Sequence, residues 1–94
     1  MVLQDQELSL RNAVAVAAMG TQAIHAGETQ IDLSPLQTVD SSAVAVMLSW
    51  QRQAQTLNRQ LHFLGVPASL LSLVQLYGLN EFFHLSARVQ TERH

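Results

Sequence analysis

Residues 31–48 read IDLSPLQTVDSSAVAVML, and the predicted fold is built outward from this stretch. Apolar and polar residues alternate at its beginning, which predicts a strand, and Pro35 marks a turn after that strand. A second short extended piece is expected at Thr38-Val39, followed by a long helix with Asp40 and Ser41 at its N-terminus. Exposed amides and the positive end of the helix dipole favour a carboxylate or a phosphate at such a position. We therefore expect the start of this helix to be a chemically distinctive place.

Length and composition limit the classes of function. The chain has 94 residues, which is enough for one domain but not for a core plus a separate catalytic domain. Its net charge is −2 and its only positive side chains apart from histidine are five arginines, so a basic surface for nucleic acid or for a membrane is not expected. The absence of cysteine excludes disulfides, thiolate catalysis and cysteine-ligated metals.

Targeting signals are not apparent in the sequence. Residues 1–7 are acidic where a signal peptide is basic, and their apolar run is too short. The apolar runs at residues 13–19 and 43–48 fall short of the ~20 residues needed to span a bilayer. We expect a cytoplasmic protein without direct membrane insertion.

The first part of the chain predicts two short strands and a helix. The strands are expected at residues 2–3 and 8–10, with a turn between them. An alanine-rich helix is expected over residues 10–26, with Ser9 as its N-cap and its end at Gly27. Gly20 inside this helix indicates close packing on a sheet or, alternatively, a kink.

The second helix has one apolar stripe, which predicts the face turned to the core. The stripe consists of Ala43, Met47, Trp50, Ala54 and Leu57. Met47 and Leu48 are expected to pack on strands that contain Ile31, Leu33, Leu61 and Phe63. Polar residues of the second half of the helix, Gln51 among them, are expected on the outside.

The remaining elements are predicted from apolar runs that end at glycine or proline. Residues 30–33 are expected to form the central strand, and residues 61–64 a strand that ends at Gly65. Pro67 is expected to open a helix over residues 68–77 that stops at Gly78. The inner stripe of this helix is predicted to be Leu70, Leu71, Val74 and Tyr77. We also expect a last helical turn at residues 79–83, an edge strand at residues 85–89 and a polar tail to residue 94.

The predicted order of strands and helices indicates an α/β fold. Strands alternate with helices, which is typical of parallel strands joined by right-handed crossovers. We predict one domain over residues 1–94, with a small mixed sheet of about four mostly parallel strands and helices packed on it, and with residues 89–94 as a C-terminal tail.

The segment from Val39 to Ala45, which follows Ile31-Asp32-Leu33-Ser34, resembles the signature of STAS domains, found in sulphate transporters and anti-sigma-factor antagonists. The segment Leu76-Tyr77-Gly78-Leu79 is most similar to the MlaB-like branch, whose members are small subunits of the Mla phospholipid ABC transporter. Two departures are Ala43, where the family usually has glycine, and a short N-terminal region. The resemblance implies a STAS fold over nearly the whole chain.

The resemblance also implies a role for Ser41. The residue after the signature aspartate is phosphorylated in the anti-sigma-factor antagonists, and its counterpart faces the ATPase in MlaB-like subunits. On residues alone, a helix cap is the better explanation of Ser41 and Ser42, with Asp40 placed for the dipole. With the resemblance, we expect a partner surface centred on Ser41. This surface consists of Asp40, Ser41, Ser42, Ala45, Ser49 and Arg52.

The sequence bears on three classes of function: an enzyme, a phosphorylation switch and a non-catalytic subunit. An enzyme is disfavoured because the sequence has no Gly-x-Ser-x-Gly, Gly-x-Gly-x-x-Gly or His-Glu-x-x-His motif, and no cofactor is expected. No metal site is expected either, because the four histidines share no ligand spacing; they are His25, His62, His84 and His94. A switch phosphorylated at Ser41 by an anti-sigma-factor kinase remains an alternative. The sequence favours a non-catalytic subunit that binds an ABC transporter ATPase.

Overall fold

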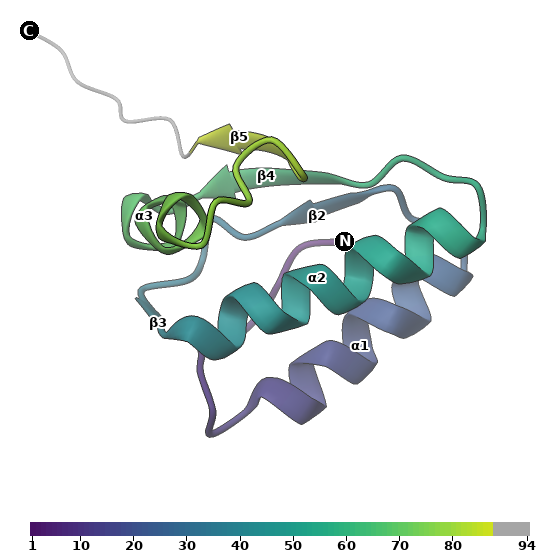
Figure 1. Cartoon of the computed structure of the whole chain (residues 1–94). Coiled ribbons are helices and arrows are strands. Elements are labelled where there is room, and N and C mark those ends of the chain that lie inside the picture. The colour runs from purple at the N-terminus through teal and green to yellow at the C-terminus, as the bar shows by residue number, and fades with distance from the viewer. Residues whose placement is uncertain (88–94) are drawn as a thin grey trace, which may run out of the picture.

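Three helices and five short strands form residues 1–87, which are the part of the chain that the computed structural model describes (Figure 1). The elements are β1 (Glu7–Leu8), α1 (Ala13–His25), β2 (Gln30–Asp32), β3 (Thr38–Val39), α2 (Ser41–Thr56), β4 (His62–Val66), α3 (Ala68–Leu76) and β5 (His84–Ala87). The predicted tail and the predicted end of the last strand, at residues 88–89, lie outside the described residues. The predicted α/β class is confirmed.

The strands of residues 1–87 pair in parallel in two hydrogen-bonded groups. β4 lies between β2 and β5, and β1 pairs with β3. The sequence predicted a single sheet of about four strands, whereas the structure has a group of three strands and a group of two. The strand predicted as central, β2, lies at an edge of the larger group, and β4 is its middle strand. The predicted strand at residues 2–3 makes an isolated bridge between Val2 and Asp32. The turn that begins after Leu33, where the Leu36 N–H donates to the Leu33 carbonyl, separates β3 from β2.

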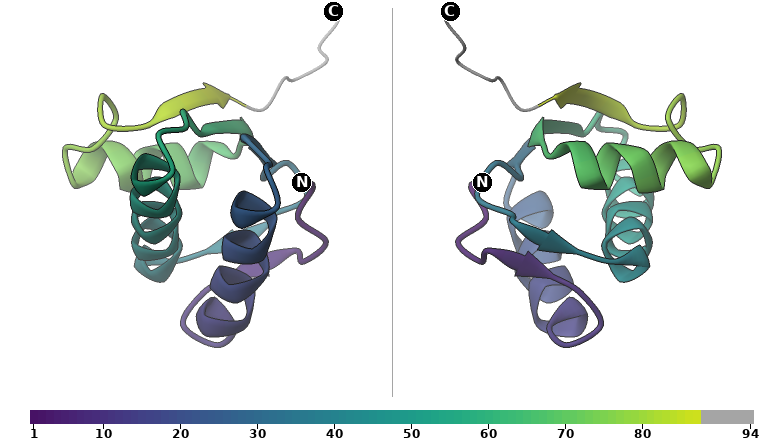
Figure 2. Two further views of the ribbon diagram at one scale, coloured as in Figure 1. Left: turned by 90° about the vertical axis from the view of Figure 1, so that its right-hand side faces the viewer. Right: turned by 90° about the vertical axis from the view of Figure 1, so that its left-hand side faces the viewer.

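α1 and α2 lie side by side beneath the sheet of β2, β4 and β5 (Figure 2). Gly20 of α1 faces the indole ring of Trp50 in α2, where an added Cβ would lie 2.2 Å from Cε2. The Trp50 Nε1–H donates to the Ala17 carbonyl at 3.0 Å. The close packing expected at Gly20 is present, although its partner is a helix rather than a sheet.

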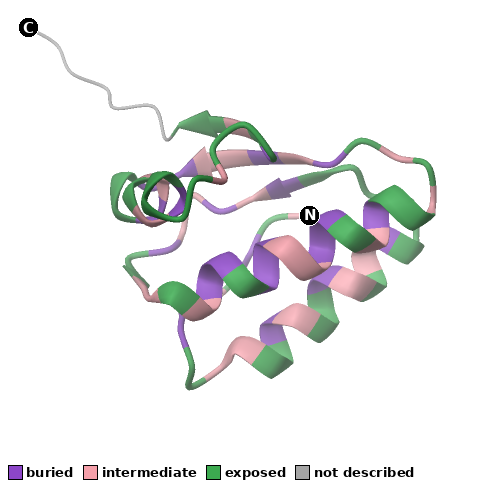
Figure 3. Ribbon diagram, in the orientation of Figure 1, coloured by how far each residue is buried: buried purple, intermediate pink, exposed green. Residues whose placement is uncertain are grey.

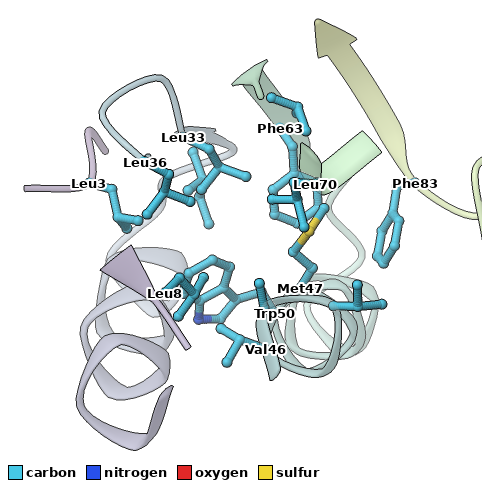
Figure 4. Close-up of a cluster of buried hydrophobic side chains, with 14 of the residues drawn as sticks. Leu3, Leu8, Leu33, Leu36, Val46, Met47, Trp50, Phe63, Leu70 and Phe83 are labelled. Carbon is cyan, nitrogen blue, oxygen red and sulfur yellow. The ribbon is translucent and has the colours of Figure 1, made fainter. Parts of the chain in front are cut away.

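The apolar stripe of α2 faces the core as predicted. α2 alternates buried and exposed segments along its length (Figure 3). Met47 and Trp50 are fully buried, and Met47 points toward Phe63 of β4 (Figure 4). The rings of Trp50 and Phe63 stack with centroids 6.3 Å apart, and Phe83 contacts Phe63 edge to face at 5.5 Å. Leu48, which was expected beside Met47 in the core, is only half-buried.

Three predictions about single residues are wrong: the exposure of Gln51, the burial of Tyr77 and the capping role of Ser9. Gln51 is 6% exposed rather than on the outside, since its Nε2 donates to the Phe82 carbonyl at 3.2 Å. Tyr77 is exposed rather than on the inner stripe, since α3 ends at Leu76. Ser9 is not the N-cap of α1, which begins after Asn12. The Asn12 side chain accepts from the Ser9 N–H at 3.0 Å and donates to the Glu7 carbonyl at 2.8 Å, which holds residues 9–12 in a turn.

Two predicted boundaries also change. Gly65 lies inside β4 with φ of 62°, where the pairing with β5 becomes irregular, and the strand continues to Val66. Residues 79–83 form turns and a bend rather than a helical turn. Pro67 precedes α3, and Gly78 with φ of 70° follows it, as expected for a helix delimited by these two residue types.

Candidate partner-binding site

Asp40 is the residue that caps α2. Its backbone is extended, and its Oδ1 accepts a hydrogen bond from the Ser42 N–H at 2.8 Å. A side-chain acceptor at this position satisfies one of the amides that a helix leaves unpaired at its start. The interpretation of Ser41 and Ser42 as the cap is therefore wrong. Ser41 is exposed at the first position of the helix.

The same carboxylate also binds the segment before α1. Asp40 Oδ2 accepts from the Leu10 N–H at 3.1 Å, and the Asp40 N–H donates to the Leu8 carbonyl at 3.4 Å. The Leu10 N–H lowers the pKa of Asp40 most, desolvation raises it, and the backbone and hydroxyl of Ser42 lower it further. The net effect holds the pKa below its ordinary value. At neutral pH the side chain is therefore an anion with two backbone donors.

Two shallow grooves flank the start of α2, and Ala45 lines both. The first, called the Tyr77 groove, has a volume of about 380 Å³. Its lining residues are Ser41, Val44, Ala45, Leu48, Tyr77 and Leu79. The second, called the Val14 groove, has a volume of about 260 Å³ and lies between α1 and α2. Its lining residues are Ala13, Val14, Ala17, Ser42, Ala45, Val46 and Ser49. No charged side chain lines either groove.

The structure brings most of the predicted site residues together. Ser41 and Ala45 are exposed on the Tyr77 groove, and half-buried Ser42 and Ser49 line the Val14 groove together with Ala45. The exposed side chain of Arg52 lies further along α2 and lines neither groove. Asp40 is half-buried beside these residues and acts as the cap described above.

Exposed apolar side chains at the start of α1 and at the end of α3 were not predicted as part of the site. Leu10 is 81% exposed and Val14 is 87% exposed, while Leu76 and Tyr77 at the end of α3 are 74% and 52% exposed. One signal was available in the sequence, because residues 13–19 are apolar on all sides of a helix. Such a helix needs cover on more than one face. A contiguous exposed apolar surface marks an interaction site.

The histidines lie elsewhere on the molecule. The rings of His62 and His84, from neighbouring strands, meet edge to face with centroids 5.2 Å apart. His25 Nε2 lies 3.0 Å from the Gln53 amide oxygen. Within residues 1–87, no three histidine or carboxylate side chains gather as a metal site, and His94 lies outside the described residues.

The comparisons with known proteins identify the family. A family model described as "Mlab, STAS domain" matches residues 5–87, so the chain belongs to the STAS family, in its MlaB-like branch. The match includes the whole of the α2 start and both grooves. The resemblance read from the sequence is confirmed.

A protein and a solved structure agree with this assignment. The chain is 35% identical over 51 residues to the intermembrane phospholipid transport system binding protein MlaB of Haemophilus influenzae. That match includes 54% of this chain and 49% of the relative, so it spans about half the length of each protein. The fold is similar to a Thermotoga maritima structure described as a "putative anti-sigma factor antagonist", with a TM-score of 0.76. At 14% identity, over 94% of this chain and 79% of that one, this likeness concerns the fold alone.

The length and apolar character of the helices decide whether one of them could cross a membrane. Within residues 1–87, no helix has both the length and the apolar character for a membrane span.

Proposed function

We propose that this chain is a non-catalytic subunit that binds and supports the ATPase of a Mla-type phospholipid ABC transporter, on the cytoplasmic side of the membrane. Its role would be in intermembrane lipid transport and outer-membrane lipid asymmetry. The observation that carries the proposal is the exposed Ser41 on the apolar Tyr77 groove, beside Ala45, which lines both grooves, in a chain of the MlaB-like branch. The name of the Haemophilus relative, a binding protein of an intermembrane phospholipid transport system, supports the same role.

The shape of the site suits a protein partner. The residues at its centre, Ser41 and Ala45, have short side chains, so another backbone or helix can approach α2 closely. The grooves on either side are apolar and lack charged residues, which is the composition of the buried centre of a protein interface. Asp40 holds the start of α2 in place through its bond to the Ser42 N–H.

The alternative is a phospho-switch in sigma-factor control, with Ser41 as the acceptor for an anti-sigma-factor kinase. The exposure of Ser41 at the first position of α2 supports it, since a kinase can reach this hydroxyl. A phosphate at the first position of α2 would gain from the helix dipole but would lie close to the ionised Asp40. Because the residue that is phosphorylated in anti-sigma-factor antagonists also follows an aspartate, this anion does not separate the two roles. The match to the MlaB family model and the Haemophilus relative make the ATPase-binding role the stronger proposal.

The test is the affinity of the chain for the Mla-type ATPase of its own organism, measured by titration calorimetry. Ser41→Arg introduces a charge into an apolar contact and should weaken binding by at least ~2 kcal/mol, which is roughly 30-fold. Because Ser41 is exposed, the thermal midpoint should change little. Gln55→Arg, an exposed position in the last part of α2, is the matched control and should bind normally.

Full-strength binding by the folded Ser41→Arg protein would reject this interface. The kinase alternative predicts instead that an anti-sigma-factor kinase transfers phosphate to the wild-type chain and not to Ser41→Ala. Hydrolysis of a nucleotide or an ester by the purified chain, lost on Ser41→Ala, would contradict the non-catalytic role.

A further inference from the structure

Two apolar side chains outside the predicted site stand almost wholly in water. Leu10 lies in the turn before α1 and is 81% exposed, and Val14 lies in the first turn of α1 and is 87% exposed. Their neighbours in the fold leave both side chains uncovered, although the chain has a well-packed core elsewhere. A single exposed apolar side chain is ordinary on a protein surface, but Val14 also lines an apolar groove, and exposed apolar side chains that gather at a groove mark an interaction site.

Leu10 is held in its position by Asp40. The two oxygens of this carboxylate have separate partners: Oδ1 accepts from the Ser42 N–H and Oδ2 accepts from the Leu10 N–H. The Asp40 N–H also donates to the Leu8 carbonyl. One side chain therefore fixes both the start of α2 and the turn that leads into α1, two segments about 30 residues apart that meet at one end of the helix pair (Figure 1).

Val14 is continuous with the proposed partner site. It lines the Val14 groove together with Ser42 and Ala45, and Ala45 also lines the Tyr77 groove beside Ser41. A partner that sits over Ala45 therefore borders both grooves. An occupant that covers Ser41 and Ala45 therefore also borders the groove that Val14 lines.

We propose that Leu10 and Val14 form a second flank of the ATPase-binding surface and that Asp40 is its positioning residue. The occupant is the same ATPase subunit, which places apolar side chains on both sides of Ala45. This inference rests on the proposed function and extends its interface from α2 to the start of α1. Asp40 acts through the Leu10 amide and does not itself need to touch the partner.

The experiment is a set of affinity measurements with the ATPase by titration calorimetry. Leu10→Ser and Val14→Ser should each weaken binding at least ~10-fold, which corresponds to ~1.4 kcal/mol, with little change in the thermal midpoint. Met19→Ser changes another exposed apolar residue of α1 that lines neither groove, and it should bind as the wild type does.

The positioning role is tested by Asp40→Asn. Asparagine is as good an N-cap as aspartate, so the bond to the Ser42 N–H is kept, but its amide group turns a donor toward the Leu10 N–H. We expect binding to fall by a factor no larger than that of Leu10→Ser, because Asp40 acts through the position of Leu10. The double variant with Leu10→Ser should lose less than the product of the two factors, because Asp40 acts through the position of Leu10 and both changes affect one contact. Independent, multiplicative losses would reject the positioning role.

The outcomes separate the two proposals. Wild-type affinity of Leu10→Ser and Val14→Ser, together with weak binding of Ser41→Arg, would overturn the second flank and leave the proposed function standing. Wild-type affinity of all three variants would reject the Ser41 interface as well as the second flank. The proposed function itself would be overturned if the wild-type chain did not bind the ATPase. If the free chain forms a dimer that Val14→Ser abolishes while the affinity for the ATPase is unchanged, this flank binds a second copy and the inference is wrong.

Discussion

Gly20→Ala is the sharpest test of the packing that supports the partner-binding site. Gly20 allows α1 to lie directly against the indole of Trp50, and a methyl group there would be 2.2, 2.3 and 2.4 Å from three atoms of that ring. Carbon atoms in contact are normally about 3.5–4.0 Å apart, so the ring or the helix would have to move by more than ~1 Å.

The ring has little freedom to move. Trp50 is fully buried, donates to the Ala17 carbonyl at 3.0 Å and stacks on Phe63. Overpacking of a core costs about 1–3 kcal/mol and the loss of the indole hydrogen bond about 1 kcal/mol. Alanine gains about 1 kcal/mol over glycine inside a helix. We expect the free energy of unfolding to fall by about 2 kcal/mol, against the increase that helix propensity alone predicts.

The assay is urea unfolding followed by the fluorescence of Trp50, which is the chain's single tryptophan. With a slope of ~1.5 kcal/mol per molar urea, the midpoint of Gly20→Ala should fall by ~1.3 M. Gln22→Ala, an exposed change in the same helix, should stay within about 0.5 kcal/mol of the wild type. A midpoint for Gly20→Ala equal to or above that of the wild type would refute the packing described here.

Two further predictions concern α2. Met47→Ala should lower the free energy of unfolding by about 2–5 kcal/mol because Met47 is fully buried. Leu48→Ala should have about half that effect because Leu48 is half-exposed. Equal losses in urea unfolding would contradict the difference in burial between the two residues. The pKa of Asp40 is lowered in the folded chain, so its contribution to stability is complete above the unfolded value of about 3.9 and is lost as the pH falls below it. The stability difference between the wild type and Asp40→Asn should accordingly be constant near neutral pH and shrink below about pH 4, and a difference that grows on acidification would be inconsistent with this pKa.

The elements governed by local interactions could be predicted from the sequence. The period of the apolar residues in residues 43–57 is enough to place the covered face of α2, because a helix brings every third or fourth residue to one side. The ends of α1 and α3 follow from Gly27 and Gly78, which adopt φ of 111° and 70° at little cost. The family signature around Asp40 and Ser41 likewise depends on adjacent residues, and it was sufficient to locate the candidate site.

The surroundings of that site depended on contacts between distant segments. A pattern along one helix specifies which residues share a face, but it does not specify which neighbour covers the face or where the cover ends. Gln51 is therefore buried by the turn that contains Phe82, and Tyr77 is exposed because α3 ends before it. The link from Asp40 to the Leu10 amide joins segments about 30 residues apart, so only the tertiary structure could bring Leu10 to the edge of the site.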